Sequence, residues 1–188
     1  MKQLRAARSG YMLISVFFYI TGILYMVKIS ASPMISCMVS GAVLISYGVV
    51  KILGYLSNDL YCLAFQYDLA CGLFLIVIGL IDMGCNLRIR EWLLPALGLL
   101  ILLDALLKIQ TAKEARDFGL QTWKRILTAS TAAGIFGAMI IIQPFSDPLA
   151  AHITVGCGLL AEGFMNQLTV METVKLNEKK EKEKDFEE

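Results

Sequence analysis

Long apolar runs separated by short polar segments make up most of the chain. Six runs carry few or no charges: residues 11–29, 34–56, 61–83, 92–107, 126–142 and 149–171. Each run is long enough, or nearly so, to cross a hydrocarbon core of about 30 Å as a helix. None alternates like a lipid-facing barrel strand, and helices are the other way to satisfy the backbone in lipid. We therefore expect an all-α integral membrane protein with six transmembrane helices.

The composition agrees with this assignment and limits what else the chain can contain. Hydrophobic residues are 57% of the 188, and the mean hydropathy is +0.65. We expect a basic N-terminus at 1–9, a membrane domain at 10–173 and a charged tail at 174–188. The tail mixes lysines with acids, so we interpret it as a solvated helix extension or a disordered end. No soluble catalytic domain fits in the remainder, and we expect no enzyme activity.

Lysine and arginine are distributed unevenly between the predicted loops. Six crossings place both termini on one side, and that side holds 14 of the 17 basic residues; Lys28, Arg88 and Arg90 make up the other 3. Cytoplasmic loops carry the excess of positive charge in membrane proteins. Both termini are therefore predicted to be cytoplasmic.

The sequence repeats itself three times without gaps. Shifts of 57 and then 58 residues superpose several glycines and polar residues: Ser15, Gly72 and Ser130; Gly22, Gly79 and Gly137; Gly41, Gly98 and Gly156; Gly48, Ala105 and Gly163; Lys51, Lys108 and Asn166. Each unit (about 10–56, 61–109 and 124–173) is predicted to be one helical hairpin. Since every unit starts on the cytoplasmic side, we expect three hairpins of parallel sense around a quasi-threefold axis along the membrane normal.

Proline and glycine suggest how these hairpins are built. Pro33 and Pro148 superpose in the repeat, with Arg90 as the middle member, and lie where a returning helix can begin. Small residues let helix backbones approach closely in lipid. We expect eight repeat glycines to serve helix packing: Gly22, Gly41, Gly48, Gly79, Gly98, Gly137, Gly156 and Gly163. A cleaved signal peptide over 2–32 is the competing interpretation of the N-terminus, but this segment belongs to the repeat.

Three polar residues are superposed inside the apolar runs: Tyr47, Asp104 and Glu162. If their faces point inward, they form an intramembrane polar cluster near the pseudo-axis, with Lys108 one turn away from Asp104. In one interpretation Asp104 pairs with Lys108 at i, i+4, and Lys108 extends its ammonium to the cytoplasmic interface. In the other, Asp104 and Glu162 belong to a proton or ion path, because intramembrane acids often mark such paths.

The remaining titratable residues give weaker predictions. Asp68 is expected to be interfacial, and Asp82 is expected to pair with Arg88 or Arg90. His152 is the only histidine, and we expect it near the outer end of the last helix. It is a candidate pH sensor for external acid, because histidine is the side chain that ordinarily changes charge near neutral pH, although a polar helix-end residue is the simpler interpretation.

The sequence shows no motif of catalysis or cofactor binding. Five cysteines are scattered at apolar positions without metal-ligand spacing, and Cys85 is the one near an outer loop. No nucleophile–base pair, phosphate-binding glycine loop or nucleic-acid-binding feature appears. We expect no metal and no cofactor. The expected partner is the lipid bilayer; a homo-oligomer or other membrane partners stay open.

The glycine and proline spacing resembles a known family. The series Gly22, Pro33, Gly41, Gly48 and its counterpart Gly137, Pro148, Gly156, Gly163 resemble the HdeD-like acid-resistance membrane proteins. The middle unit departs from this pattern at Arg90 and Ala105. The resemblance implies a non-enzymatic bacterial inner-membrane protein built from a short repeated domain, with a role in acid or envelope stress. It carries no catalytic residues. The alternative function is a small transporter or proton/ion conduit using Asp104 and Glu162.

Overall fold

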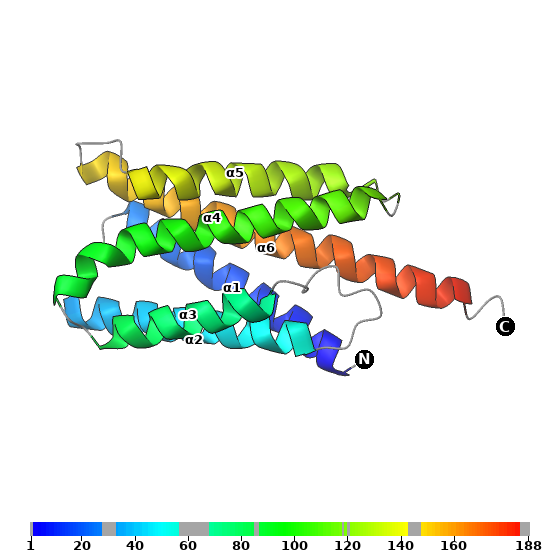
Figure 1. The fold of residues 1–188 in the computed structure, drawn as a ribbon, viewed down its shortest axis with the longest axis horizontal. Helices are drawn as coiled ribbons and strands as arrows, with labels where there is room; N and C mark the ends of the chain where they lie inside the picture. The colour runs from blue at the N-terminus through cyan, green and yellow to red at the C-terminus, as the bar shows by residue number, and fades with distance from the viewer. Residues whose placement is uncertain are drawn as a thin grey trace.

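The computed structural model is all-helical over the part of the chain that it describes. This part comprises residues 2–27, 33–56, 68–84, 87–117, 119, 121–142 and 148–184. It contains α1 (Lys2–Met26), α2 (Pro33–Leu56), α3 (Asp68–Met83), α4 (Leu87–Asp117), α5 (Trp123–Ile142) and α6 (Pro148–Lys184). The helices run back and forth in one elongated bundle (Figure 1).

The helix ends follow local chemistry. Pro33 and Pro148 are the first residues of α2 and α6, where a missing N–H costs no helical hydrogen bond. After α4, Gly119 adopts a positive φ of 75° and donates its N–H to the carbonyl of Arg116 at 2.8 Å. This left-handed glycine ends the helix and turns the chain toward α5.

Helices α4 and α6 extend furthest beyond the apolar runs that predict them. Helix α4 continues to Asp117 and α6 continues to Lys184, beyond the runs that end at 107 and 171. The added segments are rich in lysine and glutamate, which favour helix even in water. The link between α4 and α5 is therefore shorter than expected, and the tail is a helix extension as far as Lys184.

Glycines set the closest helix contacts. Helix α2 packs against α3, α4 against α5, and α1 against α6. A Cβ atom on Gly41 would lie 2.7 Å from the carbonyl oxygen of Gly79 across the α2–α3 contact. The α4–α5 and α1–α6 contacts are alike: a Cβ on Gly98 or Gly22 would lie 2.9 Å from the carbonyl oxygen of Gly137 or Gly156, respectively. Only glycine permits such close backbones.

A second set of small residues continues these contacts along the helices. A Cβ on Gly48 would lie 2.5 Å from the carbonyl oxygen of Gly72, and one on Gly163 would lie 3.0 Å from that of Ser15. All eight glycines assigned to helix packing on sequence grounds thus lie against another helix. Each close pair joins helices from two different predicted hairpins.

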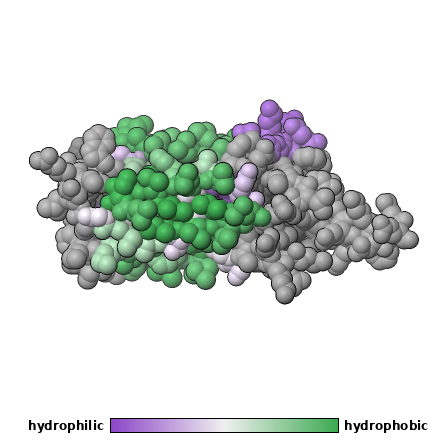
Figure 2. Space-filling model, turned by 60° about the horizontal axis from the view of Figure 1, so that its bottom comes forward, coloured by the Kyte–Doolittle hydropathy of each residue, from purple (hydrophilic) through white to green (hydrophobic). Residues whose placement is uncertain are grey.

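The surface is apolar and the interior is partly polar. Leu13, Ile135 and Ile142 are each more than half exposed, whereas Lys51, Asp104 and Glu162 are buried. A broad hydrophobic belt covers the middle of the molecule (Figure 2). Within the part of the chain that the structure describes, four helical segments are long and apolar enough to cross a membrane: Arg8–Met26, Met38–Leu56, Leu94–Asp117 and Trp123–Ile142. This distribution is that of a membrane protein.

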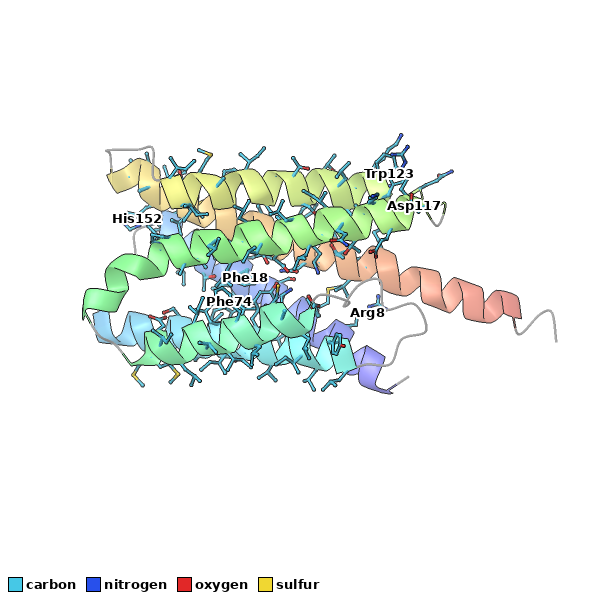
Figure 3. All side chains as sticks on the ribbon, viewed as in Figure 1. Arg8, Phe18, Phe74, Asp117, Trp123 and His152 are labelled. Atoms are coloured by element: carbon cyan, nitrogen blue, oxygen red, sulfur yellow. The ribbon has the colours of Figure 1, made fainter. Side chains whose placement is uncertain are left out.

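The two ends of the bundle differ. Arg8, Asp117 and Trp123 lie toward one end, and His152 lies toward the other (Figure 3). The first turns of α1 and the last turns of α6 lie at the same end as the α4–α5 turn (Figure 1). Arg8 of α1 and Trp123 at the start of α5 therefore share one end of the molecule.

Candidate functional site: a buried polar network

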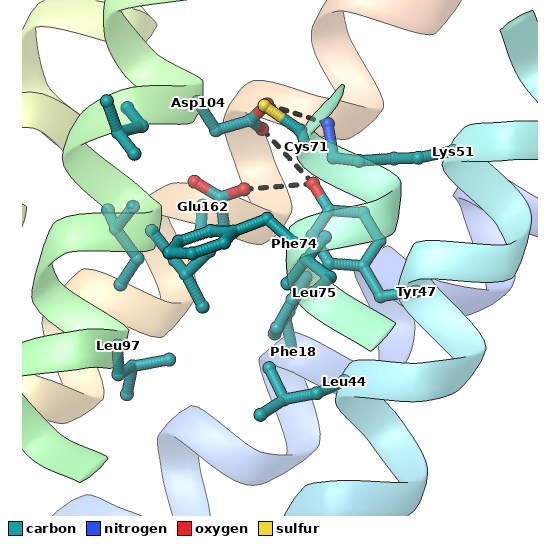
Figure 4. A pocket seen from close by; sticks show the side chains of 13 residues that line it. Phe18, Leu44, Tyr47, Lys51, Cys71, Phe74, Leu75, Leu97, Asp104 and Glu162 are labelled. Carbon is teal, nitrogen blue, oxygen red and sulfur yellow. Dashed lines mark hydrogen bonds and ion pairs between the residues drawn. The ribbon is translucent and has the colours of Figure 1, made fainter. Parts of the chain in front are cut away.

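Tyr47, Asp104 and Glu162 meet inside the bundle. They come from α2, α4 and α6, and all three are buried. The Tyr47 hydroxyl oxygen lies 3.1 Å from Asp104 Oδ2 and 3.0 Å from Glu162 Oε1 (Figure 4). The same repeat shift that superposes these residues in the sequence thus identifies three side chains that touch in space.

Lys51 supplies the positive charge beside Asp104. It follows Tyr47 by one helical turn, and its Nζ lies 2.6 Å from Asp104 Oδ1 and 2.9 Å from Asp68 Oδ1. Its side chain is 1% exposed, so both ion pairs are made out of contact with solvent. Buried charges of this kind are tolerated because they are paired and hydrogen-bonded.

This arrangement corrects the expectation for Lys108. Asp104 makes its short ion pair with Lys51 across the helix interface, and not with Lys108 one turn along α4. Lys108 does not extend to an interface: it is 3% exposed, and its Nζ lies 5.7 Å from the centre of the Tyr11 ring. The ammonium of a lysine that faces the bundle interior can be stabilised there by aromatic rings and carboxylates. Lys108 therefore stays inside the bundle.

Asp68 and Tyr11 belong to the same network. Asp68, expected at the interface, is 3% exposed and accepts hydrogen bonds from the Tyr11 hydroxyl and from Lys51 Nζ. Tyr11 is fully buried. The sequence contained a signal for this contact, because the 57-residue shift superposes Tyr11 on Asp68 as it superposes Tyr47 on Asp104.

Asn166 completes the network on α6. Its amide nitrogen lies 2.6 Å from the Tyr47 hydroxyl oxygen and 2.8 Å from Glu162 Oε1. The repeat superposes Asn166 on Lys51 and Lys108, and all three are buried. An amide in the third unit therefore occupies the position at which the first two units have an ammonium.

Aromatic rings surround the ammonium of Lys51. Its Nζ lies 5.0 Å from the centre of the Tyr47 ring and 5.8 Å from that of Tyr11. Phe18 packs edge-on against Tyr47, with ring centres 5.1 Å apart. Ring faces stabilise a nearby cation, and edge-to-face pairs add packing energy. The network is thus held by charge pairs, hydrogen bonds and ring contacts together.

A small cavity adjoins the network. Its volume is about 30 Å³, and Tyr47, Lys51, Asp104 and Glu162 are among the residues around it. The other residues around it are apolar apart from Cys71, and come from α1, α2, α3 and α4 (Figure 4). The surface that faces the cavity is almost entirely apolar.

The other predicted residues lie away from this network. Asp82 is buried and accepts a hydrogen bond from Ser40; the side chains of Arg88 and Arg90, its expected partners, lie outside the described residues. His152 lies at the opposite end of the bundle from Arg8, with its ring centre 5.4 Å from that of Tyr25 (Figure 3). Nothing in its surroundings identifies it as a sensor.

The structure places two of the cysteines. Cys71 and Cys157 are free thiols of intermediate exposure, and the side chain of Cys85 lies outside the described residues. Among the residues that the structure describes, no group of three His, Cys, Asp or Glu side chains is placed to hold a metal ion.

Comparison with known proteins finds a similarity over part of the chain. No similar curated protein and no similar solved structure is found. Residues 13–83 match the family described as a short repeat of unknown function (DUF308). That repeat is the family domain of HdeD-like proteins. The matched segment begins in α1 and ends with the last residue of α3, so the similarity includes the glycine contact between α2 and α3.

Proposed function

We propose that the chain is a six-span membrane protein that acts without catalysis in acid or envelope stress tolerance. Its three hairpins enter the membrane in the same sense, with both termini in the cytoplasm of a bacterial inner membrane. The DUF308 match and the resemblance to HdeD-like proteins support the membrane role. The excess of basic residues on the side of the termini supports the orientation.

One observation carries this proposal. The buried network takes charged or hydrogen-bonding side chains from α1, α2, α3, α4 and α6, and joins them by direct contacts. Three proposed hairpins that meet in such a core form one closed unit in the bilayer. A unit of this kind fits a protein that maintains a membrane under stress better than it fits an enzyme with an open cleft.

The proposal is tested by survival. The gene is deleted in its host, and cells are challenged with acid and, separately, with an envelope-damaging detergent. We expect survival to fall and to return when the native gene is restored. A His152→Ala gene is a second complementation arm, and we expect it to restore survival fully. Unchanged survival of the deletion strain in both challenges would refute the stress role.

A proton or ion conduit through Asp104 and Glu162 is a separate candidate. Both carboxyls contact the Tyr47 hydroxyl in the middle of the bundle, so a proton could pass between them. The test is proton flux in proteoliposomes containing the native protein, Asp104→Asn or Glu162→Gln. Flux that both variants lose would favour a conduit, and flux equal to that of empty liposomes would exclude one.

A further inference from the structure

The Tyr47 hydroxyl has two carboxyl oxygens beside it but only one proton to donate. It carries one proton, yet its oxygen lies 3.1 Å from Asp104 Oδ2 and 3.0 Å from Glu162 Oε1. The Asn166 amide donates to the same oxygen from 2.6 Å and therefore supplies no acceptor. Two buried oxygens at this distance are stabilised by a proton between them. If both contacts are hydrogen bonds, one of them uses a proton that belongs to a carboxyl group.

The charges around the two carboxyls show which one holds that proton. Asp104 lies 2.6 Å from the ammonium of Lys51, which favours its ionised form. Glu162 has no ammonium group as a described hydrogen-bond partner: its partners are the Tyr47 hydroxyl, the Asn166 amide and the Asp104 carboxyl. Its proton can be donated to Tyr47, while the Tyr47 proton is donated to Asp104.

Charge balance leads to the same assignment. Among the described residues, the buried network contains two ammonium groups, Lys51 and Lys108, and three carboxyls, Asp68, Asp104 and Glu162. Two ionised aspartates balance the two lysines. A third negative charge would lie unbalanced in an apolar interior, which is costly.

Glu162 lies beside the apolar cavity. It is 2% exposed and is one of the residues around this cavity of about 30 Å³, whose surface is almost entirely apolar. Burial in an apolar setting disfavours a charged carboxylate and therefore favours the neutral acid.

We infer that Glu162 is a buried proton-binding site, which stays neutral beside ionised Asp104. This assignment stands whether or not the protein acts in acid tolerance. Of the described groups, those that face Glu162 are Tyr47 and Lys51 from α2, Asp104 from α4, and Asn166 from its own helix. Tyr11 and Asp68 follow beyond Lys51.

Two partly exposed side chains line the cavity. They are Phe74 of α3 and Leu103 of α4, which are 41% and 39% exposed. We therefore expect a lateral route, by which an apolar molecule in the membrane reaches the cavity past these two side chains. Access from the lipid rests on the proposed membrane arrangement. The assignment of a proton to Glu162 does not depend on that arrangement.

Infrared spectroscopy tests the proton directly. We expect the native protein at neutral pH to show the carbonyl stretch of a protonated carboxylic acid that shifts in heavy water. Glu162→Gln should lack the Glu162 component of this band. Asp82→Asn is the matched control, because Asp82 is a buried carboxyl outside the network; it should keep that component. Identical spectra of the native protein and Glu162→Gln would overturn the inference.

Carbodiimide labelling tests both the site and its access. Dicyclohexylcarbodiimide adds to a protonated carboxyl: the acid proton moves to one nitrogen, the acyl group ends on the other, and nothing leaves. Incubated with proteoliposomes, it should label Glu162, as seen by peptide mass spectrometry, and a water-soluble carbodiimide should not. Labelling of Asp104 instead would overturn the proton assignment. No labelling of Glu162 while its infrared band is present would overturn the lateral route.

Discussion

At the scale of single residues, the ammonium of Lys51 is the group on which two carboxylates depend. It pairs with Asp104 and Asp68, which come from α4 and α3. Sequence reasoning predicted the meeting of Tyr47, Asp104 and Glu162 because the repeat places equivalent residues at one depth. It chose the wrong partner for Asp104, since an i, i+4 lysine is visible in one helix whereas the distance to Lys51 depends on how two helices pack.

Removal of the Lys51 charge should therefore destabilise the bundle. In Lys51→Met, Asp104 and Asp68 lose their ammonium while they stay buried. Breaking a buried pair in this way costs about 3–5 kcal/mol. We expect the free energy of unfolding in detergent to fall by this order. Lys113→Met is the control, because Lys113 is exposed on α4, and it should change stability little. Equal losses in both variants would show that the ion pairs do not hold the core.

The two central carboxyls should respond differently to amide substitution. Glu162→Gln replaces a neutral acid by a neutral amide, so we expect the melting temperature to stay near that of the native protein. Asp104→Asn removes an ionised partner of Lys51 and should lower the melting temperature clearly. A loss of melting temperature in Glu162→Gln as large as that in Asp104→Asn would show that Glu162 is ionised as well.

At the scale of helices, glycine decides which faces meet. The glycine spacing predicted that eight repeat glycines lie in helix contacts. The prolines predicted the first residues of α2 and α6. Neither pattern predicted that the closest contacts join helices of different hairpins. The hydrophobic pattern and the glycine spacing identify which face of a helix makes contacts. Several helices have such a face, so the sequence pattern does not say which two helices pack together.

Two glycines of α5 allow a direct test of this packing. A Cβ on Gly137 would lie 2.8 Å from the backbone nitrogen of Leu102, whereas one on Gly134 would meet its nearest atom, Ala105 Cβ, at 3.4 Å. Gly137→Ala forces two backbones apart, and overpacking of this kind costs about 1–3 kcal/mol. Gly134→Ala should be neutral or stabilising. Thermal unfolding in detergent measures both, and equal stability of the two variants would contradict the assigned contact.

At the scale of the whole molecule, the polar interior and apolar exterior favour the membrane, and the ends of the bundle favour one orientation. Sequence reasoning predicted an all-helical chain and the shared end of both termini. It did not predict how far α4 and α6 extend. The prediction followed the apolar runs, whereas the residues that extend these two helices are polar.

Cysteine labelling from one side tests the orientation. In a protein whose five cysteines are replaced by serine, Gln121→Cys introduces a thiol in the α4–α5 turn and Ser146→Cys introduces one between α5 and α6. A membrane-impermeant maleimide added outside spheroplasts should label Ser146→Cys alone. Labelling of Gln121→Cys from outside would reverse the proposed topology.

The contact between α1 and α6 brings the first and last helices of the chain together as closely as two helices that follow each other. Helices α1 and α6 are therefore neighbours in the bundle although they are far apart in the sequence. If the N-terminal end of α1 and the C-terminal end of α6 were joined by a linker and the chain were opened between α2 and α3, we expect every glycine contact to form. The fold therefore should not depend on the order in which the helices are synthesised. A circularly permuted gene should encode the same bundle.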